Sequence, residues 1–336
     1  KNNRYYFIRI KTRFYIKPGY LPFIQIKGSH LYTPTECLES SDVYDRASGE
    51  KGAFYTGLDG KIHDTRVELT LTCTDYELFR EHYYVYDFEI LDGCYYETRI
   101  GLFDDYIEKY KKIKLESKGA KRTLAKLYLN NLYGKFASNT DSSFKVAYLK
   151  NDALAFYPVD EHLKRPGYIP VGSAITSYAR NFTIRAAQKN YHGVDKPGFI
   201  YADTDSIHCD LSVDKVKGLP IHKKNFCCWK IESYWDKAIF TRQKTYIEHI
   251  THEDGEPVEQ PYNNIKCAGM PENCKDLLDK SMTGNYDLDE IEDKEQREFV
   301  QVKRTYKDFR VGLRVPGKLR PVRIPGGTLL VNDYYT

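Results

Sequence analysis

Residues 198–211, GFIYADTDSIHCDL, place three polar residues between two short apolar runs. The runs 199–201 and 207–210 have the aromatic, β-branched and alternating character of β-strands. The polar residues Asp-Thr-Asp, 203–205, fall at the join, where a tight hairpin would put them. We therefore predict a hairpin whose turn carries both aspartates.

Asp203 and Asp205 make this turn a candidate metal site. Residues two apart along a strand share a face, which would place both carboxylates on one side with Cα atoms about 7 Å apart. Hard divalent cations such as Mg²⁺ bind one or two carboxylates together with substrate phosphates. Two ions about 4 Å apart clamp the attacking and leaving oxygens in phosphoryl transfer. The alternative is an ordinary turn, in which Asp hydrogen-bonds its own backbone.

The composition is that of a globular chain with room for two or three subdomains. Hydrophobic residues make up 41% of the 336 and charged residues 29%. No apolar run of about 18 residues and no charged-plus-apolar leader is present, so neither a membrane span nor a signal peptide is indicated. The eight cysteines include no C-x-x-C pair. This favours reduced thiols in a cytoplasmic protein.

Basic residues gather in two zones. The first 35 residues carry seven Lys or Arg and no acid, and residues 303–323 carry eight against one Asp. Such zones are typical of surfaces that contact a phosphate backbone. A solvated charged face is the alternative for either zone. An acidic run, 287–298, lies between them.

Helical and strand periodicities alternate along the rest of the chain. Residues 241–250, TRQKTYIEHI, predict a strand with Lys244 and Tyr246 on one face. Residues 39–65 predict an exposed loop or hairpin, and 271–300 are expected to be partly helical. Other strands are predicted within 4–16, 23–26 (after a turn at 17–19), 69–73 and 84–90. Helices are predicted over 75–82, 101–115, 121–138 and 172–191. Hairpins are predicted over 144–157 and 319–333.

The helix predicted at 121–138, KRTLAKLYLNNLYGKFAS, has a chemically mixed face. Lys126, Asn130 and Tyr133 are spaced i, i+4, i+7 and so lie on one side. A triphosphate could bind the cation, and a base or sugar could stack on the ring. An amphipathic helix whose polar stripe faces water explains the spacing equally well.

Three motifs stand in a fixed order: KLYLNNLYG at 126–134, YADTDS at 201–206 and QKTYI at 243–247. Together they resemble the family B DNA polymerases, above all the protein-primed branch of phages and linear plasmids, the phi-twenty-nine type. The stretches YLPFIQIK, YGKFASN, KCAGM and IPGGTLLVND extend the resemblance over essentially the whole chain. It implies an α+β, right-hand polymerase fold of palm, fingers and thumb.

The resemblance also implies a catalytic centre. Asp205 would be the main ligand of two Mg²⁺ or Mn²⁺ ions, with Asp203 as its acidic companion. Lys126 would bind the phosphates of the incoming deoxynucleotide and stabilise the charge that develops on them. The function implied is template-directed addition of deoxynucleotides to a primer.

Other motif residues would contact the nucleotide and the DNA. Asn130 and Tyr133 would line the nascent base pair, and Gly134 would permit its close approach. Asn131 stands where the family usually has Ser, which puts one hydrogen bond in doubt. The primer terminus and the duplex product would be held by Lys244 and Tyr246, and by the basic residues Arg310, Arg314, Lys318 and Arg320.

Two inserted subdomains that contact DNA or a terminal priming protein are implied as well. The second insertion would help to encircle the template and promote strand displacement. The C-terminal segment is longer than the resemblance predicts, because of the acidic stretch at 280–300. The implied bounds are 1–115 for the first insertion and the remaining palm edge, 116–138 for the fingers helix, 139–171 for the second insertion, 172–270 for the palm and 271–336 for the thumb.

One catalytic element of the family is not found. The family needs a further Asp in an upstream D-x-x-S-L-Y-P motif, and the nearest strings here, at Asp42 and Asp87, lack the Leu-Tyr-Pro. The three-carboxylate exonuclease domain is not found either. We therefore expect the C-terminal portion of a polymerase that works in the cytoplasm of a host cell if phage-encoded. Its missing Asp would come from a separate polypeptide or from an N-terminal part of the same gene.

Two alternatives belong to other functional classes. A non-catalytic DNA-binding subunit, or a remnant of such a polymerase, would keep the basic zones without the chemistry. Salt-sensitive DNA binding without Mg²⁺-dependent nucleotide affinity would favour it. An RNA polymerase or reverse transcriptase is disfavoured by KLYLNNLYG and QKTYI.

Overall fold

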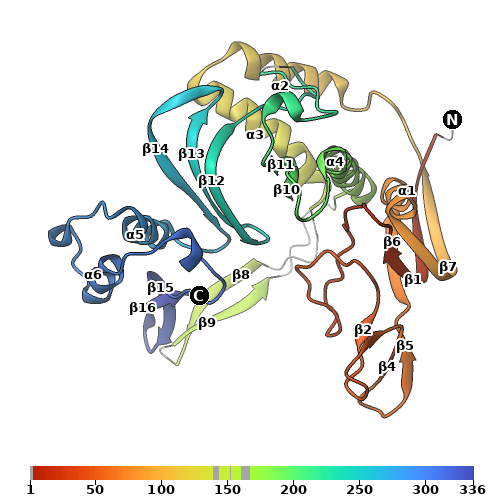
Figure 1. Cartoon of the computed structure of the whole chain (residues 1–336), viewed down its shortest axis with the longest axis horizontal. Coiled ribbons are helices and arrows are strands. Elements are labelled where there is room, and N and C mark those ends of the chain that lie inside the picture. The colour runs from red at the N-terminus through yellow and green to blue at the C-terminus, as the bar shows by residue number, and fades with distance from the viewer. Residues whose placement is uncertain (1–2, 139–143, 152, 160–166, 224) are drawn as a thin grey trace. The chain divides into compact units, whose positions relative to one another are not determined.

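The computed structural model describes residues 3–138, 144–151, 153–159, 167–223 and 225–336 (Figure 1). The chain forms two compact units, each built from segments that are distant in sequence. Unit 1 comprises residues 1–140 and 165–219, and unit 2 comprises residues 141–164 and 220–336. Both units mix helices with antiparallel strands, as the α+β prediction requires.

Unit 1 contains a three-stranded antiparallel sheet in the order β6–β1–β7, made of β1 (Arg4–Ile16), β6 (Val67–Thr72) and β7 (Tyr83–Glu97). Helix α1 (Cys73–His82) follows β6 directly and contacts all three strands. The Thr72 side chain caps this helix by accepting a hydrogen bond from the Asp75 amide at 3.1 Å. Phe14, Phe79 and Tyr83 are buried together between sheet and helix.

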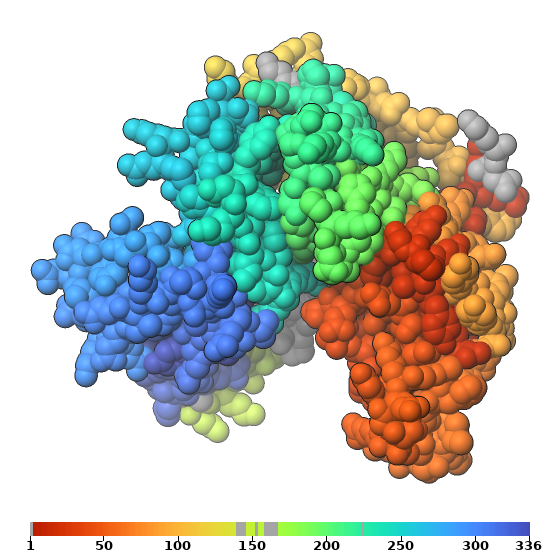
Figure 2. Space-filling view, in the orientation of Figure 1, coloured from red at the N-terminus to blue at the C-terminus, as the bar shows by residue number. Residues whose placement is uncertain are grey.

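The polar stretch predicted as a loop or hairpin forms two small antiparallel pairs. These are β2 (Val43–Tyr44) with β3 (Lys51–Gly52) and β4 (Phe54–Thr56) with β5 (Ile62–Asp64). In the space-filling view these hairpins form an orange lobe that projects from the sheet of unit 1 (Figure 2).

The strand predicted at 23–26 is wrong. These residues form no strand, because a buried side chain takes up two of their amides. Tyr83 Oη accepts hydrogen bonds from the amides of Phe23 (2.8 Å) and Ile24 (3.3 Å) and donates one to the Leu38 carbonyl (2.9 Å). One hydroxyl therefore replaces the neighbouring strand that the apolar pattern suggested.

Tyr83→Phe should lower the free energy of unfolding by about 2 kcal/mol, because it leaves buried backbone groups without a partner. Burial raises the pKa of this hydroxyl, so it stays protonated and able to donate. Equilibrium chemical denaturation measures the change. The control is Tyr84→Phe, at a side chain that is 49% exposed. Equal effects of the two substitutions would contradict the role given to the Tyr83 hydroxyl.

The other half of unit 1 consists of helices α2 (Asp104–Glu116), α3 (Gly119–Phe136) and α4 (Ile169–Asn190) and the hairpin of β10 (Phe199–Asp203) and β11 (Ser206–Cys209). A 3₁₀ turn, η1 (Val213–Lys215), follows. Helix α4 contacts α1, α3, β10 and β11. It is therefore the element to which the rest of this half is attached.

Unit 2 contains a second antiparallel sheet, of β12 (Ser233–Arg242), β13 (Thr245–Glu253) and β14 (Glu256–Cys267). Helices α5 (Glu272–Thr283) and α6 (Lys294–Gln301) and the short turns η2 (Leu288–Glu290) and η3 (Tyr306–Asp308) follow it. The acidic run packs onto this core, because Ile291 within it and Phe299 and Val300 directly after it are buried.

Two hairpins complete unit 2. One is β15 (Val315–Ile324) with β16 (Gly327–Tyr335), as predicted for the C-terminal end. The other is β8 (Phe144–Lys150) with β9 (Ala153–Val159), which was also predicted. The Arg323 guanidinium lies over the Phe156 ring, 4.9 Å from its centroid, so the two hairpins pack together.

No helix in the described ranges is long and apolar enough to cross a membrane. All eight cysteines are free thiols, as the sequence predicted.

Candidate active site

The predicted aspartate hairpin is confirmed, and its turn has two residues. Asp203 ends β10 and pairs with Ser206 at the start of β11, which leaves Thr204 and Asp205 as the turn. The strand-periodicity argument for the two carboxylates is therefore wrong, since Asp205 is not on a strand. Both aspartates nevertheless lie at the tip of one hairpin.

The backbone at this tip is strained. Thr204 has a φ of 51°, a left-handed conformation that costs a β-branched residue about 1–3 kcal/mol. The Thr204 hydroxyl donates to Asp203 Oδ1 at 3.0 Å, and the Ser206 hydroxyl donates to the Asp203 carbonyl at 3.1 Å. From α4, the Thr183 hydroxyl donates to the Thr204 carbonyl at 2.9 Å. These bonds hold the strained turn on which both carboxylates are carried.

The chain segments on both sides of the hairpin lie against the end of α4. The Asn190 side chain is fully buried. Its NH₂ group donates to the backbone carbonyls of Ala186 (2.9 Å) and Lys217 (3.1 Å). Its side-chain oxygen accepts a hydrogen bond from the backbone amide of Lys217 (2.8 Å). A Cβ at Gly198 would lie 2.3 Å from the Asn190 carbonyl oxygen. Only glycine therefore allows β10 to begin this close to the helix.

The aspartate pair fits a hard divalent cation. Among the described residues no group of three or more His, Cys, Asp or Glu side chains could hold a metal ion. A site that binds through one or two carboxylates and leaves its other positions to substrate phosphates is the usual arrangement for Mg²⁺. Asp203 and Asp205 supply that donor set, without a cage made of protein alone.

Helix α3 presents the predicted mixed face to solvent. Lys126, Asn130 and Tyr133 are all exposed, and a Cβ at Gly134 would meet nothing within 4 Å beyond its chain neighbours and the helix's own backbone. Ala125 is the one buried residue of this helix. Leu124 is exposed as well. The predicted face is therefore open to solvent, and apolar residues of this helix are exposed beside it.

Two further cations join Lys126 on the α2–α3 pair. Burial lowers the pKa of Lys114, and the positive charges of Arg122 and Lys126 lower it further. The sequence analysis missed both neighbours. Arg122 could have been found from its i, i+4 spacing to Lys126, whereas Lys114 is brought there only by the pairing of the helices. Three cations that act on one another electrostatically form a setting suited to phosphates.

Tyrosine side chains hold α2 against α3. No residue of α2 is buried. The rings of Tyr110 and Tyr128 stack with centroids 4.8 Å apart, and Tyr106 lies 4.6 Å from Tyr110. The Tyr106 hydroxyl donates to the Tyr128 carbonyl at 2.9 Å. These aromatic contacts set the register that brings Lys114 to the cations of α3.

Lys244 and Tyr246 differ from their predicted placement on one strand face. Strand β12 ends at Arg242 and β13 begins at Thr245, so Lys244 is in the turn, with a φ of 56°. Its carbonyl accepts a hydrogen bond from the Ala268 amide at 3.0 Å. Tyr246 lies on β13 and stacks on Phe240, with centroids 5.1 Å apart. A strained hairpin turn thus occurs at this motif too.

The predicted DNA-contacting residues of the C-terminal zone are at the surface, and several have protein partners. Arg310, Arg314 and Arg320 are exposed and Lys318 is half-buried. Arg320 forms a 3.0 Å ion pair with Asp333. Arg314 and Lys318 lie over the rings of Tyr334 and Tyr335, at 4.3 and 5.9 Å from the centroids. These contacts preorganise the cations on one hairpin.

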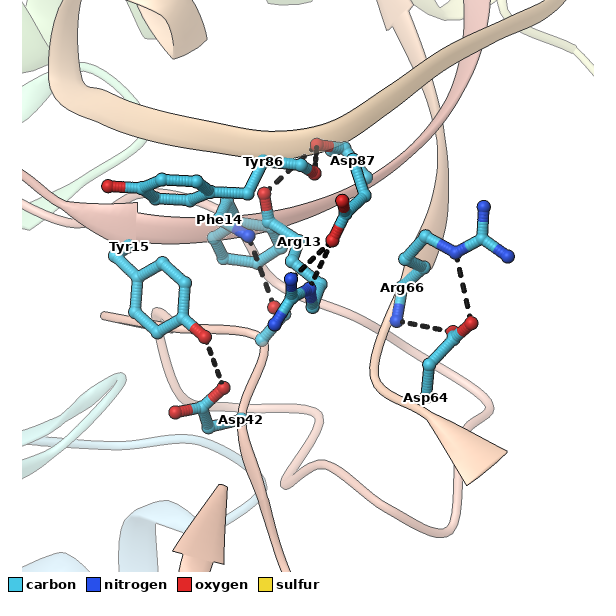
Figure 3. A network of polar contacts seen from close by, with 10 residues as sticks. Arg13, Phe14, Tyr15, Asp42, Asp64, Arg66, Tyr86 and Asp87 are labelled. Atoms are coloured by element: carbon cyan, nitrogen blue, oxygen red, sulfur yellow. Dashed lines mark hydrogen bonds and ion pairs between the residues drawn. The ribbon is translucent and has the colours of Figure 1, made fainter. Parts of the chain in front are cut away.

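Two arginines of the N-terminal basic zone are paired with carboxylates of the same sheet. Arg13 pairs with Asp87 across the sheet, as Figure 3 shows. Arg9 pairs with Asp92 at 2.7 Å and with Glu68 at 3.3 Å. Cross-strand carboxylates neutralise both arginines, which supports the alternative of a solvated charged face.

The predicted residues fall into two groups. Within unit 1, α4 contacts both α3 and the β10–β11 hairpin, so the cationic face and the aspartate turn are attached to one helix. Lys244, Tyr246 and the C-terminal basic residues belong to unit 2.

This chain is similar to known proteins over nearly its whole length. The family described as DNA polymerase type B, organellar and viral, matches residues 1–217. The DNA polymerase of Bacillus phage phi29 is 39% identical over 339 aligned positions, which cover 97% of this chain and 50% of the phage protein. That of Streptococcus phage Cp-1 is 34% identical over 335 positions, which cover 98% of this chain and 49% of the relative.

A solved structure is similar over nearly the whole chain. It is the phi29 DNA polymerase in complex with primer–template DNA and incoming nucleotide, with a TM-score of 0.74 and 36% identity over 99% of this chain and 51% of that one. The predicted right-hand polymerase fold is thereby confirmed. The chain spans about half the length of these relatives.

Proposed function

This chain belongs to the organellar and viral type B DNA polymerases, and we propose that it is the C-terminal catalytic portion of a DNA-directed DNA polymerase. It adds deoxynucleotides to a primer. The 3′-oxygen attacks the α-phosphorus, the bond to the bridging oxygen breaks, and pyrophosphate leaves. The observation that carries this proposal is that α4 contacts both the cationic helix α3 and the β10–β11 hairpin, which bears the aspartate turn, within unit 1.

Asp203 and Asp205 would hold two divalent ions, Mg²⁺ or Mn²⁺, at the β10–β11 turn. When bound, such ions activate the primer hydroxyl and neutralise charge on the leaving group. The protein's part is to present the carboxylates on a fixed backbone. The hydrogen bond from Thr183 to the Thr204 carbonyl supports this role, because it fixes the turn from α4.

Lys126, with Lys114 and Arg122, would bind the triphosphate of the incoming deoxynucleotide. The mutual repulsion that lowers the pKa of Lys114 is relieved when a polyanion binds among the three cations. The same cations stabilise the negative charge that develops during transfer. The nascent base pair would lie beside Asn130, Tyr133 and Gly134.

Unit 2 would bind the primer and the duplex product. Lys244 and Tyr246 would hold the primer terminus, and Arg310, Arg314, Lys318 and Arg320 would contact phosphates of the duplex. The subdomains proposed are the first insertion with the palm edge (1–115), the fingers helix (116–138), the second insertion (139–171), the palm (172–270) and the thumb (271–336).

A third catalytic carboxylate, in a D-x-x-S-L-Y-P motif that these 336 residues do not contain, would complete the site. It would come from N-terminal residues of the same protein or from a second polypeptide, together with the exonuclease domain. We place the enzyme in the cytoplasm of a host cell. There, a terminal protein would prime replication and contact the insertions.

Complementation tests this function. The 336-residue chain should not extend a primed template with Mg²⁺ by itself, and a polypeptide bearing the exonuclease domain and D-x-x-S-L-Y-P should restore extension when mixed with it. The matched control is the same polypeptide with that motif's Asp changed to Asn. Extension by the chain alone would contradict the shared site. A mixed complex that binds DNA without extending it would favour a non-catalytic subunit.

A further inference from the structure

A tyrosine of the C-terminal strand links the acidic run to the basic zone. The Tyr334 hydroxyl donates to Glu295 Oε2 of α6 at 2.6 Å. The ring of the same tyrosine lies beneath the Arg314 guanidinium, 4.3 Å from Cζ. Two residues before it, the Asn332 amide donates to Asp293 Oδ2 at 3.4 Å. Helix α6 and strand β16 are thus joined at the point where Arg314 is stacked.

The two contacts of Tyr334 reinforce each other. A phenol that donates to a carboxylate carries more electron density on its ring, and a richer ring attracts a cation more strongly. Both neighbours also affect the pKa of the Tyr334 hydroxyl. The hydrogen bond to Glu295 raises this pKa, and the positive charge of Arg314 acts to lower it. Glu295 therefore acts on Arg314 through the ring.

Helix α6, which carries Glu295, is held in a fixed position by its cap and by its buried face. Asp293 caps the helix by accepting a hydrogen bond from the Gln296 amide at 2.9 Å. Phe299 and Val300 anchor its other face in the core of unit 2. An exposed arginine otherwise loses considerable rotamer freedom when it binds a phosphate. A stacked arginine has already lost part of it.

We propose that Glu295 is a positioning residue for DNA binding: acting through Tyr334, it holds Arg314 in place to contact a phosphate. The proposal rests on the proposed function, in which Arg314 contacts the duplex. Simple electrostatics predicts the opposite sign, because an acid beside a phosphate-binding arginine repels DNA. The sign of the effect therefore distinguishes the two mechanisms.

Glu295→Ala and Glu298→Ala form the matched test. Both remove one negative charge from exposed positions of the same helix, but Glu298 contacts Lys294, at 3.8 Å, and not Tyr334. Glu295→Ala should weaken binding of the 336-residue chain to primer–template duplex about threefold. Tyr334→Phe, which keeps a ring but loses the same link, should weaken binding at least as much, because the repelling charge of Glu295 then remains. Glu298→Ala should leave binding unchanged or slightly tighter.

The salt dependence separates positioning from a general loss of structure. Arg314→Ala should reduce the slope of log K against log salt concentration by about one. Glu295→Ala added to Arg314→Ala should change neither the affinity nor the slope further, whereas a merely structural role would weaken binding again.

Two results would overturn the positioning role alone: equal effects of Glu295→Ala and Glu298→Ala, or further weakening in the double variant. If Arg314→Ala itself leaves affinity and slope unchanged, the proposed DNA contact of Arg314 fails, and the positioning role fails with it. The Arg314 variant thus distinguishes the two failures.

Discussion

Replacing Asp205 by asparagine should reduce primer extension at least about a thousandfold in the complemented assay. Asparagine has nearly the same shape, so the β10–β11 turn should persist. It lacks the negative charge that a divalent ion requires, and the protein offers at this turn only one further carboxylate, that of Asp203. The loss should therefore appear in kcat, with little change in the affinity for DNA.

Asp195→Asn is the matched control, because Asp195 is an exposed aspartate in the loop that leads into β10. It should leave extension unchanged. Thermal unfolding of both variants shows whether the fold is intact. Near-normal extension by folded Asp205→Asn would contradict a metal-binding role of this turn.

Lys126→Ala should raise the KM for the incoming deoxynucleotide about thirtyfold, equivalent to ~2 kcal/mol. The lost group is one of the three cations on the α2–α3 pair, and the triphosphate carries the charge that they would neutralise. Steady-state kinetics of single-nucleotide addition measures the change. The same substitution should raise the pKa of Lys114, since one of the charges that lower it is removed. An NMR titration of that side chain gives a readout independent of activity.

The control for this residue is Lys121→Ala. Lys121 is also an exposed lysine of α3, but it lies about 140° around the helix from Lys126. Its removal should leave the KM unchanged. If the two substitutions raise the KM equally, the effect is one of general charge, and a specific phosphate contact by Lys126 is contradicted.

Local sequence chemistry was sufficient for the elements that carry the candidate site. The β10–β11 hairpin, helices α3 and α4 and the C-terminal hairpin all follow from interactions between residues a few positions apart. The motif order, read as a resemblance, was enough to predict the right-hand polymerase fold.

The two candidate catalytic turns show where local rules mislead. Thr204 and Lys244 adopt positive φ values at positions where Gly, Asn or Asp is the usual signal. The sequence at both sites therefore suggested continuous strand character, and the residues after Asp203 and Arg242 were given strand periodicity. Strained turns without glycine are held by their surroundings, as the bond from Thr183 to the Thr204 carbonyl illustrates.

By itself, the sequence determined helices α3 and α4, the β10–β11 and C-terminal hairpins, the order of the motifs and the chemistry of the aspartate turn. Only the tertiary structure decided which basic side chains are paired with carboxylates and which lie near other cations. Arg9 is neutralised by Asp92, 83 positions away, while Lys114 joins Lys126 through the pairing of two helices. The GFIYADTDSIHCDL hairpin is attached by α4 to that cationic face. The physical reason is that Coulomb interactions depend on distance in space, which strand register and helix packing set and which composition along the chain does not reveal.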